Sequence, residues 1–262
     1  MTKPVGVFDS GVGGLSVLRE IRTALPSEDL IYVADSGYAP YGDRPEEFIQ
    51  TRATAIVQFL ISQQAKAVVV ACNTATGIAI DALRAEFSIP LVAIEPAVKP
   101  AAALTRSGIV GILATTQTLS SSKFSRLLAG QSEQVRFLLQ PCPGLVERVE
   151  DGELSSPATR ALVERYVRPL VEQGADTLVL GCTHYPFLEN VIQSVAGPAV
   201  SIIDPAVAVA RELHRRLQMN GLLSDDSEKG NDRFWTTGNP AEVQAVMDLL
   251  WLKHVNVSVI ER

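Results

Sequence analysis

The stretch VVVACNT at positions 68–74 decides the fold class of this chain, and LVLGCTH at positions 178–184 repeats its pattern. Each stretch is a short apolar run followed by a small residue, a cysteine and two polar residues. Such runs are typical of parallel strands that are buried on both faces. Cys72 and Cys182 therefore come where a predicted strand ends, at the edge of the sheet where open α/β folds bind their ligands.

Strand-like runs alternate with segments of helical spacing along almost the whole chain. We predict helices at 46–63, 157–173 and 205–219. The predicted strands are 4–8, 30–34, 67–71, 90–94, 108–113, 134–139, 176–180, 199–203, 232–236 and 255–259. Alternation of this kind predicts an α/β protein with mainly parallel sheets.

The chain also repeats itself weakly, in the same order and at nearly one spacing. VGVF at 5–8 returns as VGIL at 110–113, AC at 71–72 returns as GC at 181–182, and IEPAV at 94–98 returns as IDPAV at 203–207. We therefore expect two similar three-layer α/β domains with mainly parallel sheets, related by pseudo-twofold symmetry. Residues 1–97 and 207–262 would form the first domain, and residues 98–206 the second. This arrangement places Cys72 and Cys182 in the cleft between the domains.

Composition excludes several classes of protein. The chain has 262 residues, of which 47% are hydrophobic, and a formal net charge of −6. Nucleic-acid binding needs a basic surface, so we expect no nucleic-acid partner. No apolar stretch approaches the roughly 18 residues of a membrane span, and three cysteines do not make a disulfide framework. We expect a cytoplasmic protein without membrane association and without a signal peptide at its start.

Two thiols that face one small substrate can act as an acid and a base. A cysteine thiol has a reference pKa of about 8.5, which its neighbours can lower. A thiolate on one side of a tetrahedral carbon can remove a proton, while a thiol on the other side supplies one. This transfer inverts the stereocentre, and exchanging the two protonation states reverses the reaction. Cys72 and Cys182 are therefore candidate catalytic residues for interconverting mirror images.

Two polar residues near the cysteines can tune them. His184 lies two positions after Cys182, and Asp9 follows the first predicted strand. An imidazole or a carboxylate beside a thiol can orient or shuttle its proton. A packing or capping role for His184 and a turn or helix-capping role for Asp9 are the alternatives. We include both residues among the catalytic candidates and leave the alternatives open.

Four motifs follow one another along the chain. They are FDSGVGGL at 8–15, PYG at 40–42, ACNTAT at 71–76 and GCTHYP at 181–186. Together they resemble glutamate racemase. The resemblance implies an enzyme that interconverts L- and D-glutamate without a cofactor or metal ion, and that supplies D-glutamate for peptidoglycan synthesis and so for cell-wall biogenesis and cell shape. It also implies that Cys72 takes the α-proton from D-glutamate and Cys182 from L-glutamate, with Asp9 and His184 as auxiliary residues.

The motif regions contain almost no lysine or arginine, although a dicarboxylic amino acid must be held. Hydroxyl groups and backbone N–H groups at helix N-termini can bind carboxylates without a formal positive charge. Several hydroxyl residues follow predicted strands, although each alone could be an ordinary helix cap. By resemblance, the substrate-binding residues are Asp9, Ser10, Pro40, Tyr41, Gly42, Asn73, Thr74, Thr115, Thr118, Thr183 and His184.

Some assignments have alternatives. Glu150 resembles an auxiliary carboxylate of the family, but Glu147 or Asp151 could occupy the same place, and Thr116 makes the alignment around Thr115 ambiguous. The sequence leaves the oligomeric state open, and a homodimer is compatible with it. In some family members an N-terminal extension accompanies activation by a peptidoglycan precursor, and the short segment before the first predicted strand implies that this control is absent.

Other functions fit the sequence less well. Gly11-Val12-Gly13 follows a predicted strand, but Ser16 stands where a dinucleotide-binding fingerprint has its third glycine. No C-x-x-C redox motif occurs, and neither Cys72 nor Cys182 is followed by the arginine of a phosphate-binding cysteine loop. Zinc bound by Cys72, Cys182 and His184 is chemically conceivable.

The nearest alternative is an aspartate racemase, or another two-cysteine racemase or isomerase of the same family, because the length of the pocket cannot be read from the sequence. A non-catalytic scaffold protein has little reason to keep two thiols that are prone to oxidation. The third cysteine, Cys142, lies between two prolines and lacks the polar neighbours of the other two. We expect a structural role for it.

Overall fold

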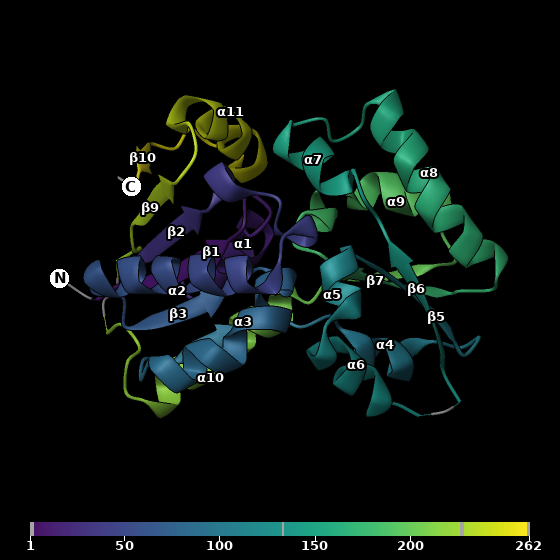
Figure 1. Ribbon diagram of the computed structural model, residues 1–262, viewed down its shortest axis with the longest axis horizontal. Helices are drawn as coiled ribbons and strands as arrows, with labels where there is room; N and C mark the ends of the chain where they lie inside the picture. The colour runs from purple at the N-terminus through teal and green to yellow at the C-terminus, as the bar shows by residue number, and fades with distance from the viewer. Residues whose placement is uncertain (1–2, 133, 226–227, 261–262) are drawn as a thin grey trace.

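The computed structural model describes residues 3–132, 134–225 and 228–260. Two parallel sheets with helices packed against them lie side by side along the long axis of the molecule (Figure 1). Within the described residues no helix is long and apolar enough to cross a membrane.

The first sheet has the strand order β10-β9-β2-β1-β3-β4. Its strands are β1 (Val5–Asp9), β2 (Leu30–Ala34), β3 (Ala67–Val70), β4 (Leu91–Ala93), β9 (Asp232–Thr236) and β10 (Val257–Val259). The helices around it are α1 (Leu15–Ala24), α2 (Glu46–Ser62), α3 (Asn73–Glu86), α10 (Ala206–Met219) and α11 (Pro240–Trp251), together with the 3₁₀ turns η1 (Ser36–Tyr38) and η2 (Tyr41–Asp43).

Alternate residues of the central strands face two separate apolar clusters. Val5 and Val7 of β1 pack in the cluster that contains α1 and α10, whereas Phe8 packs in the cluster that contains α2 and α3. Side chains of successive strand residues point to opposite faces, so both faces of this sheet are covered. This double burial explains why the strand sequences are continuously apolar.

The second sheet has the strand order β6-β5-β7-β8. Its strands are β5 (Ile109–Ala114), β6 (Arg136–Pro141), β7 (Thr177–Gly181) and β8 (Ser201–Ile203). The helices around it are α4 (Val98–Leu104), α5 (Thr116–Ser120), α6 (Ser122–Ala129), α7 (Leu145–Glu150), α8 (Pro157–Glu172) and α9 (Glu189–Ala196), with the 3₁₀ turn η3 (Tyr185–Leu188).

The two sheets share one topology. The order β2-β1-β3-β4 in the first sheet corresponds to β6-β5-β7-β8 in the second, and all the pairings are parallel. The prediction of two similar α/β units with mainly parallel sheets is thus confirmed. Every predicted strand is present, with its ends within two residues of the expected positions. The chain boundaries at 97 and 206 stay a prediction.

Candidate active site

The two cysteines occupy equivalent places in the fold. Cys72 follows β3 and Cys182 follows β7, each the third strand of its sheet in chain order. Cys72 is also the N-cap of α3, because its sulfur accepts a hydrogen bond from the N–H of Ala75 at 3.4 Å. The side chains of Cys72 and Cys182 are 5% and 6% exposed, so both thiols are buried.

The C-terminal edges of the two sheets meet between these thiols. The hydroxyl of Thr183, beyond β7, donates to Oδ2 of Asp9, at the end of β1, at 3.0 Å. The hydroxyl of Ser16 on α1 donates to the carbonyl of Thr183 at 2.9 Å. Residues that are far apart in the sequence are therefore in direct contact across a closed cleft between the sheets.

Asp9 combines a turn role with a contact across the cleft. Its Oδ1 accepts from the N–H of Ser10 at 2.9 Å, and its Oδ2 accepts from the N–H of Gly14 at 2.6 Å in addition to Thr183. Burial raises the pKa of Asp9, although the nearby His184 and the hydrogen bond from Thr183 oppose this shift. Asp9 therefore has the turn function that the sequence left open, and it also contacts Thr183 across the cleft.

The surroundings of Cys72 favour its protonated form. Its thiol donates to the hydroxyl oxygen of Ser10, with 3.7 Å between the sulfur and the oxygen. Burial, and then the negative charge of Asp9, raise the pKa of Cys72, and its hydrogen bonds with Ala75 and Ser10 only partly compensate. A positive charge brought into the cleft by a ligand would favour the thiolate.

Cys182 has a different partner. Nδ1 of His184 lies 3.7 Å from its sulfur, and Nε2 of His184 lies 2.6 Å from Oε1 of Glu150 at the end of α7. Burial by itself would lower the pKa of His184, but hydrogen bonds to Cys182 and Glu150 outweigh it and raise the pKa well above its usual value. Glu150 also accepts from the N–H of Val12 at 2.8 Å, which ties this pair to the turn after β1.

Of the three carboxylates considered at this place, Glu150 is the one bonded to His184. Asp151 instead forms an ion pair with Arg148 at 3.8 Å, and Glu147 lines a small cavity. Cys142 lines the same cavity, and its thiol donates to the carbonyl of Gln140 at 3.3 Å.

The glycines of the turn after β1 make room for these side chains. A Cβ atom on Gly11 would overlap Oε1 of Glu150, and one on Gly13 would overlap the imidazole of His184. The glycine pattern that resembles part of a dinucleotide fingerprint is thus accounted for by close packing on Glu150 and His184. Ser16, the position that breaks the fingerprint, makes the contact with Thr183.

Three threonine hydroxyls from the two sheets form a ring. Oγ1 of Thr74, in the first turn of α3, lies 3.0 Å from Oγ1 of Thr115 and 3.2 Å from Oγ1 of Thr118. The Thr115 and Thr118 hydroxyls are 2.9 Å apart. Thr115 is also the N-cap of α5, so its predicted alternative role as a helix cap is real and coexists with the contact to Thr74.

Asn73 has an unusual environment. It is 4% exposed, and among the described residues neither its amide oxygen nor its amide nitrogen has a hydrogen-bond partner. Buried polar groups in native proteins nearly always have partners. An amide that can accept from an ammonium group and donate to a carboxylate suits an amino-acid ligand.

The segment 40–42 lies at the same cleft. A Cβ atom on Gly42 would be 3.2 Å from Cβ of Thr115, and Pro40 lines the small cavity beside Gly42 and Thr115. The hydroxyl of Tyr41 bonds to the carboxylate of Asp35, a residue that the sequence analysis did not single out. All the predicted binding residues therefore come from segments that converge on the cleft, with the Tyr41 hydroxyl engaged within the protein.

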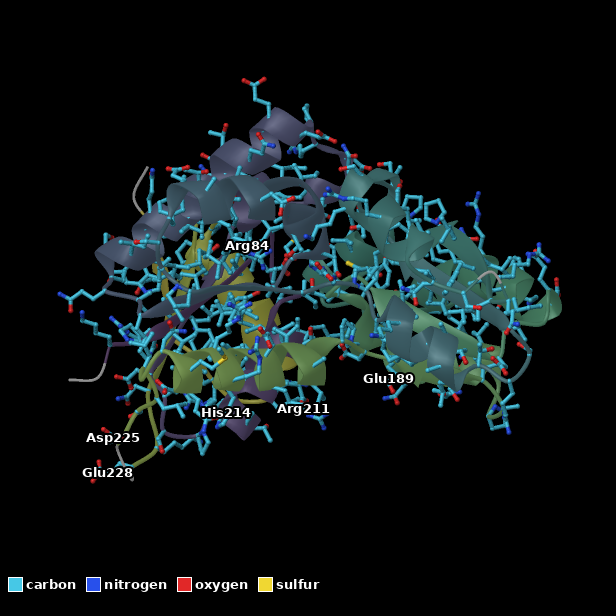
Figure 2. All side chains as sticks on the ribbon, turned by 90° about the horizontal axis from the view of Figure 1, so that it is seen from below. Arg84, Glu189, Arg211, His214, Asp225 and Glu228 are labelled. Atoms are coloured by element: carbon cyan, nitrogen blue, oxygen red, sulfur yellow. The ribbon has the colours of Figure 1, made fainter. Side chains whose placement is uncertain are left out.

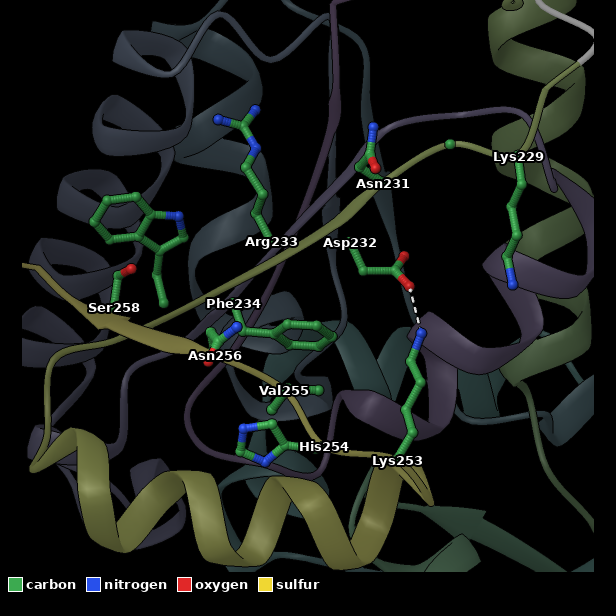
Figure 3. A pocket seen from close by; sticks show the side chains of 12 residues that line it. Lys229, Asn231, Asp232, Arg233, Phe234, Lys253, His254, Val255, Asn256 and Ser258 are labelled. Atoms are coloured by element: carbon green, nitrogen blue, oxygen red, sulfur yellow. Dashed lines mark hydrogen bonds and ion pairs between the residues drawn. The ribbon is translucent and has the colours of Figure 1, made fainter.

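Among the residues that the structure describes, charged side chains outside the cleft do not form a comparable site. Across the described parts of the chain no three His, Cys, Asp or Glu side chains are arranged to hold a metal ion. A groove of about 600 Å³ lies beside the N-terminal ends of β9 and β10, but its cations do not converge: Lys253 pairs with Asp232 at 3.3 Å, while Arg233 points to the other side (Figure 3). His214, on α10, is exposed at the periphery (Figure 2).

The chain is similar to known proteins in both sequence and fold. Residues 5–213 match the family Asp/Glu/Hydantoin racemase. The chain is 57% identical over 249 residues to a glutamate racemase of Methylococcus capsulatus, covering 95% of this chain and 92% of that protein. It is similar to the crystal structure of a glutamate racemase isoform from Bacillus anthracis, with a TM-score of 0.90, 35% identity and coverage of 99% and 97%. It is also similar to the Escherichia coli glutamate racemase solved with L-glutamate and the activator UDP-MurNAc-ala, with a TM-score of 0.86, 32% identity and 98% of both chains covered.

Proposed function

The chain belongs to the Asp/Glu/Hydantoin racemase family, and from this premise we propose that it interconverts L- and D-glutamate by cofactor-independent proton transfer between two thiols. One observation carries the proposal. Cys72 and Cys182 follow equivalent strands of two sheets whose C-terminal edges meet, so a small substrate in the cleft would lie between two thiols. A mechanism with a single general base would not require a second thiol at the equivalent position of the other sheet.

The two thiols exchange roles with the direction of the reaction. With D-glutamate, the thiolate of Cys72 removes the α-proton and the thiol of Cys182 supplies a proton to the opposite face of Cα. With L-glutamate, Cys182 is the base and Cys72 the acid. Each turnover leaves the protonation states exchanged, so a second turnover in the same direction needs a proton moved back. We propose that Asp9, which bonds to Thr183 across the cleft, and His184, which lies beside Cys182, relay this proton.

The substrate itself supplies the positive charge that the surroundings of Cys72 lack. In the free protein, burial and Asp9 keep this thiol protonated by raising its pKa. The α-ammonium group of glutamate, bound near Asp9, would stabilise the thiolate by its charge. Deprotonation of Cys72 is in this way coupled to the presence of substrate.

The polar groups around the thiols fit the rest of the substrate. Asn73 brings a buried amide without a partner among the described residues, and Ser10, Thr74 and Thr183 bring hydroxyls. At the N-termini of α3 and α5, the N–H groups of Ala75 and Thr118 donate to Cys72 and Thr115, and helix N-termini favour carboxylates. A site without lysine or arginine among these groups would hold a dicarboxylate mainly through hydrogen bonds.

Substrate entry requires the two sheets to move apart, because both thiols are buried. The chain passes from the first sheet to the second at 94–97 and returns at 204–205. Each connection contains a proline, and both belong to the repeated motif. We propose that the cleft opens by bending at these two segments.

The role in the cell follows from the reaction. We place the D-glutamate product in peptidoglycan synthesis, and therefore in cell-wall biogenesis and cell shape, and the protein in the cytoplasm. A homodimer is the assembly to test first, by sedimentation velocity over a range of protein concentrations.

The experiment is incubation of each enantiomer with the protein in D₂O, without added pyridoxal phosphate or metal. We expect solvent deuterium at Cα mainly in the inverted product. Cys72→Ala and Cys182→Ala should each abolish racemisation, whereas Cys142→Ala, which removes a buried thiol outside the pair, should retain it. Near-normal turnover by either of the first two variants would show that the two-base assignment is wrong. A higher kcat/KM with aspartate than with glutamate would replace the proposed substrate by its nearest alternative.

A further inference from the structure

A buried polar cluster lies beside the cleft and takes no part in the proposed proton transfer. We call it the Asp35 anchor; it consists of Asp35, Tyr41, Arg52 and Thr237. Asp35 directly follows β2, beside Asp9 at the end of β1, and it is fully buried. A buried carboxylate is stable only when it is paired and hydrogen-bonded.

Every lone-pair direction of the Asp35 carboxylate is used. Oδ1 accepts from Nη2 of Arg52 and from the hydroxyl of Thr237, both at 2.7 Å. Oδ2 accepts from Nε of Arg52 at 3.0 Å and from the hydroxyl of Tyr41. The two-pronged contact with Arg52 fixes the orientation of the carboxylate. The Arg52 guanidinium in turn lies 3.7 Å from the centre of the Tyr38 ring.

Tyr41 connects the anchor to the cleft. Its ring is 1% exposed and packs in the apolar cluster that includes Cys72. The residues after Tyr41 contact the second half of the chain. Gly42 faces Thr115, and the carbonyl of Arg44 accepts from Nε2 of Gln117 at 2.8 Å. The segment 40–44 is therefore held to the first sheet through the Tyr41 hydroxyl and to α5 through its own backbone.

We propose that Asp35, together with Arg52, is a positioning residue that sets where the segment 40–44 lies against Thr115 and thereby sets the affinity of the cleft for its substrate. The inference rests on the proposed function, because glutamate is the ligand whose binding it concerns. Arg52 also neutralises the negative charge of Asp35, which would otherwise repel a dicarboxylate substrate bound nearby.

The expected kinetic signature is a change in binding with little change in chemistry. The hydrogen bonds of the Asp35 carboxylate go to Arg52, Tyr41 and Thr237 rather than to either thiol, so the proton transfer itself should be retained. A segment that lies in the wrong place weakens the binding of ground state and transition state alike, which raises KM at nearly constant kcat. Enantiomers have equal free energies, so kcat/KM must fall by the same factor in both directions.

Tyr41→Phe tests this with the smallest change, because it removes one hydroxyl and keeps the packed ring. We expect KM for L- and D-glutamate to rise about tenfold, the equivalent of one hydrogen bond to a charged group, with kcat within about twofold of the wild type. Arg52→Lys keeps the positive charge but loses the two-pronged geometry, and should give the same rise in KM. Asp35→Asn should do so as well, provided that it folds.

Tyr166→Phe is the matched control, because this variant removes a hydroxyl that donates to the carbonyl of Pro143 at 2.7 Å in the second half. Melting temperatures are measured for all variants. An anchor that serves stability alone would lower the melting temperature of Tyr41→Phe and Arg52→Lys while leaving KM at the value of Tyr166→Phe, and this result would overturn the inference. If the wild-type protein fails to racemise glutamate, the proposed function itself fails, which separates the two outcomes.

Discussion

Replacing Glu150 by glutamine tests the electrostatic arrangement on the Cys182 side of the cleft. The change removes a negative charge and keeps the shape of the side chain, including an oxygen that can accept from Val12 and His184. Without that charge the pKa of His184 falls towards its ordinary value, because the ion pair is one of the interactions that raise it. The imidazole is then protonated over a narrower range of pH beside Cys182.

The geometry of the pair gives the size of the effect. Nε2 of His184 and Oε1 of Glu150 are 2.6 Å apart, and the two side chains are 2% and 20% exposed. A hydrogen bond between charged groups contributes about 1.5–3 kcal/mol. The introduced amide would still accept a hydrogen bond, so we take the net loss in Glu150→Gln as about 2 kcal/mol. This energy corresponds to a loss of about 30-fold in kcat/KM at neutral pH, equal in both directions.

The stability effect has a defined dependence on pH. The pKa of His184 is higher in the folded protein than in the unfolded chain, so the stabilisation is complete below the unfolded value of about 6.5 and is lost as the pH rises through the folded value. Glu150→Gln should therefore lower the free energy of unfolding by about 2 kcal/mol at about pH 6 and by less in alkaline solution. Urea unfolding monitored by circular dichroism measures the difference.

Proton NMR of the histidine rings provides the direct assay. The chain has three histidines, and the His184 resonance is identified by its loss in His184→Asn. In Glu150→Gln this resonance should titrate at lower pH than in the wild type, and the basic limb of the kcat/KM profile should shift in the same direction. Asp248→Asn, which removes the partner of the exposed His254, is the control and should leave both observations unchanged. A Glu150→Gln variant with kcat/KM within threefold, as an approximate limit, of the wild type and an unshifted His184 resonance would refute the reasoning.

Three further predictions concern packing, thiol reactivity and acid stability. Gly13→Ala should reduce stability by about 1–3 kcal/mol and racemisation by at least about tenfold, because the added methyl overlaps the active-site imidazole. The control Gly130→Ala should be tolerated, because the nearest neighbour of its new atom is 3.7 Å away. Thermal melts measure the change in stability, and kcat/KM measures the change in racemisation. Burial and a neighbouring carboxylate raise the pKa of Cys72, so iodoacetamide should modify it at neutral pH at least about tenfold more slowly than free cysteine, and peptide mass spectrometry showing rapid modification would contradict this. Although burial opposes it, hydrogen bonds from residues 105–107 lower the pKa of Asp176 to about 2. Asp176→Asn should therefore cost about 1 kcal/mol above about pH 4, and the difference should vanish as the pH falls through about 2, as followed by urea unfolding.

The sequence was sufficient for the parts of the structure that are set by local patterns. Strands buried on both faces are continuously apolar, so their positions, and hence the positions of Cys72 and Cys182 just beyond β3 and β7, could be predicted. The weak repeat likewise indicated two units with one topology. Both features depend on residues that are close together in the chain or on patterns that recur at a fixed spacing.

Contacts between the two halves could not be predicted in this way. The bond from the N–H of Val12 to Glu150 joins residues 138 positions apart, and that from Ser16 to Thr183 joins residues 167 positions apart. Which of Glu147, Glu150 and Asp151 reaches the imidazole depends on how α7 is rotated against the first sheet, and no local pattern encodes that rotation. The resemblance to a family indicated Glu150 as a candidate, and the three-dimensional arrangement shows that its partner is His184.

Asp35 was missed for a different reason. It directly follows β2, one position beyond the register partner of Asp9, so its position alone was nearly as informative as that of Asp9. Its partners, Tyr41, Arg52 and Thr237, come from three separate segments, and no pattern in the sequence indicates that they converge. A second acidic residue at the C-terminal end of a central strand is the signal that could have drawn attention to it.

The ring of threonine hydroxyls has a consequence for the solvation of the site. Each hydroxyl carries one proton that can turn about its C–O bond, so the three groups of Thr74, Thr115 and Thr118 can satisfy one another when no ligand is present. When a carboxylate arrives, the same protons can rotate towards it. The three hydroxyls therefore fill one another's hydrogen-bonding capacity in the closed cleft, and binding at this point exchanges these internal hydrogen bonds for hydrogen bonds to the ligand.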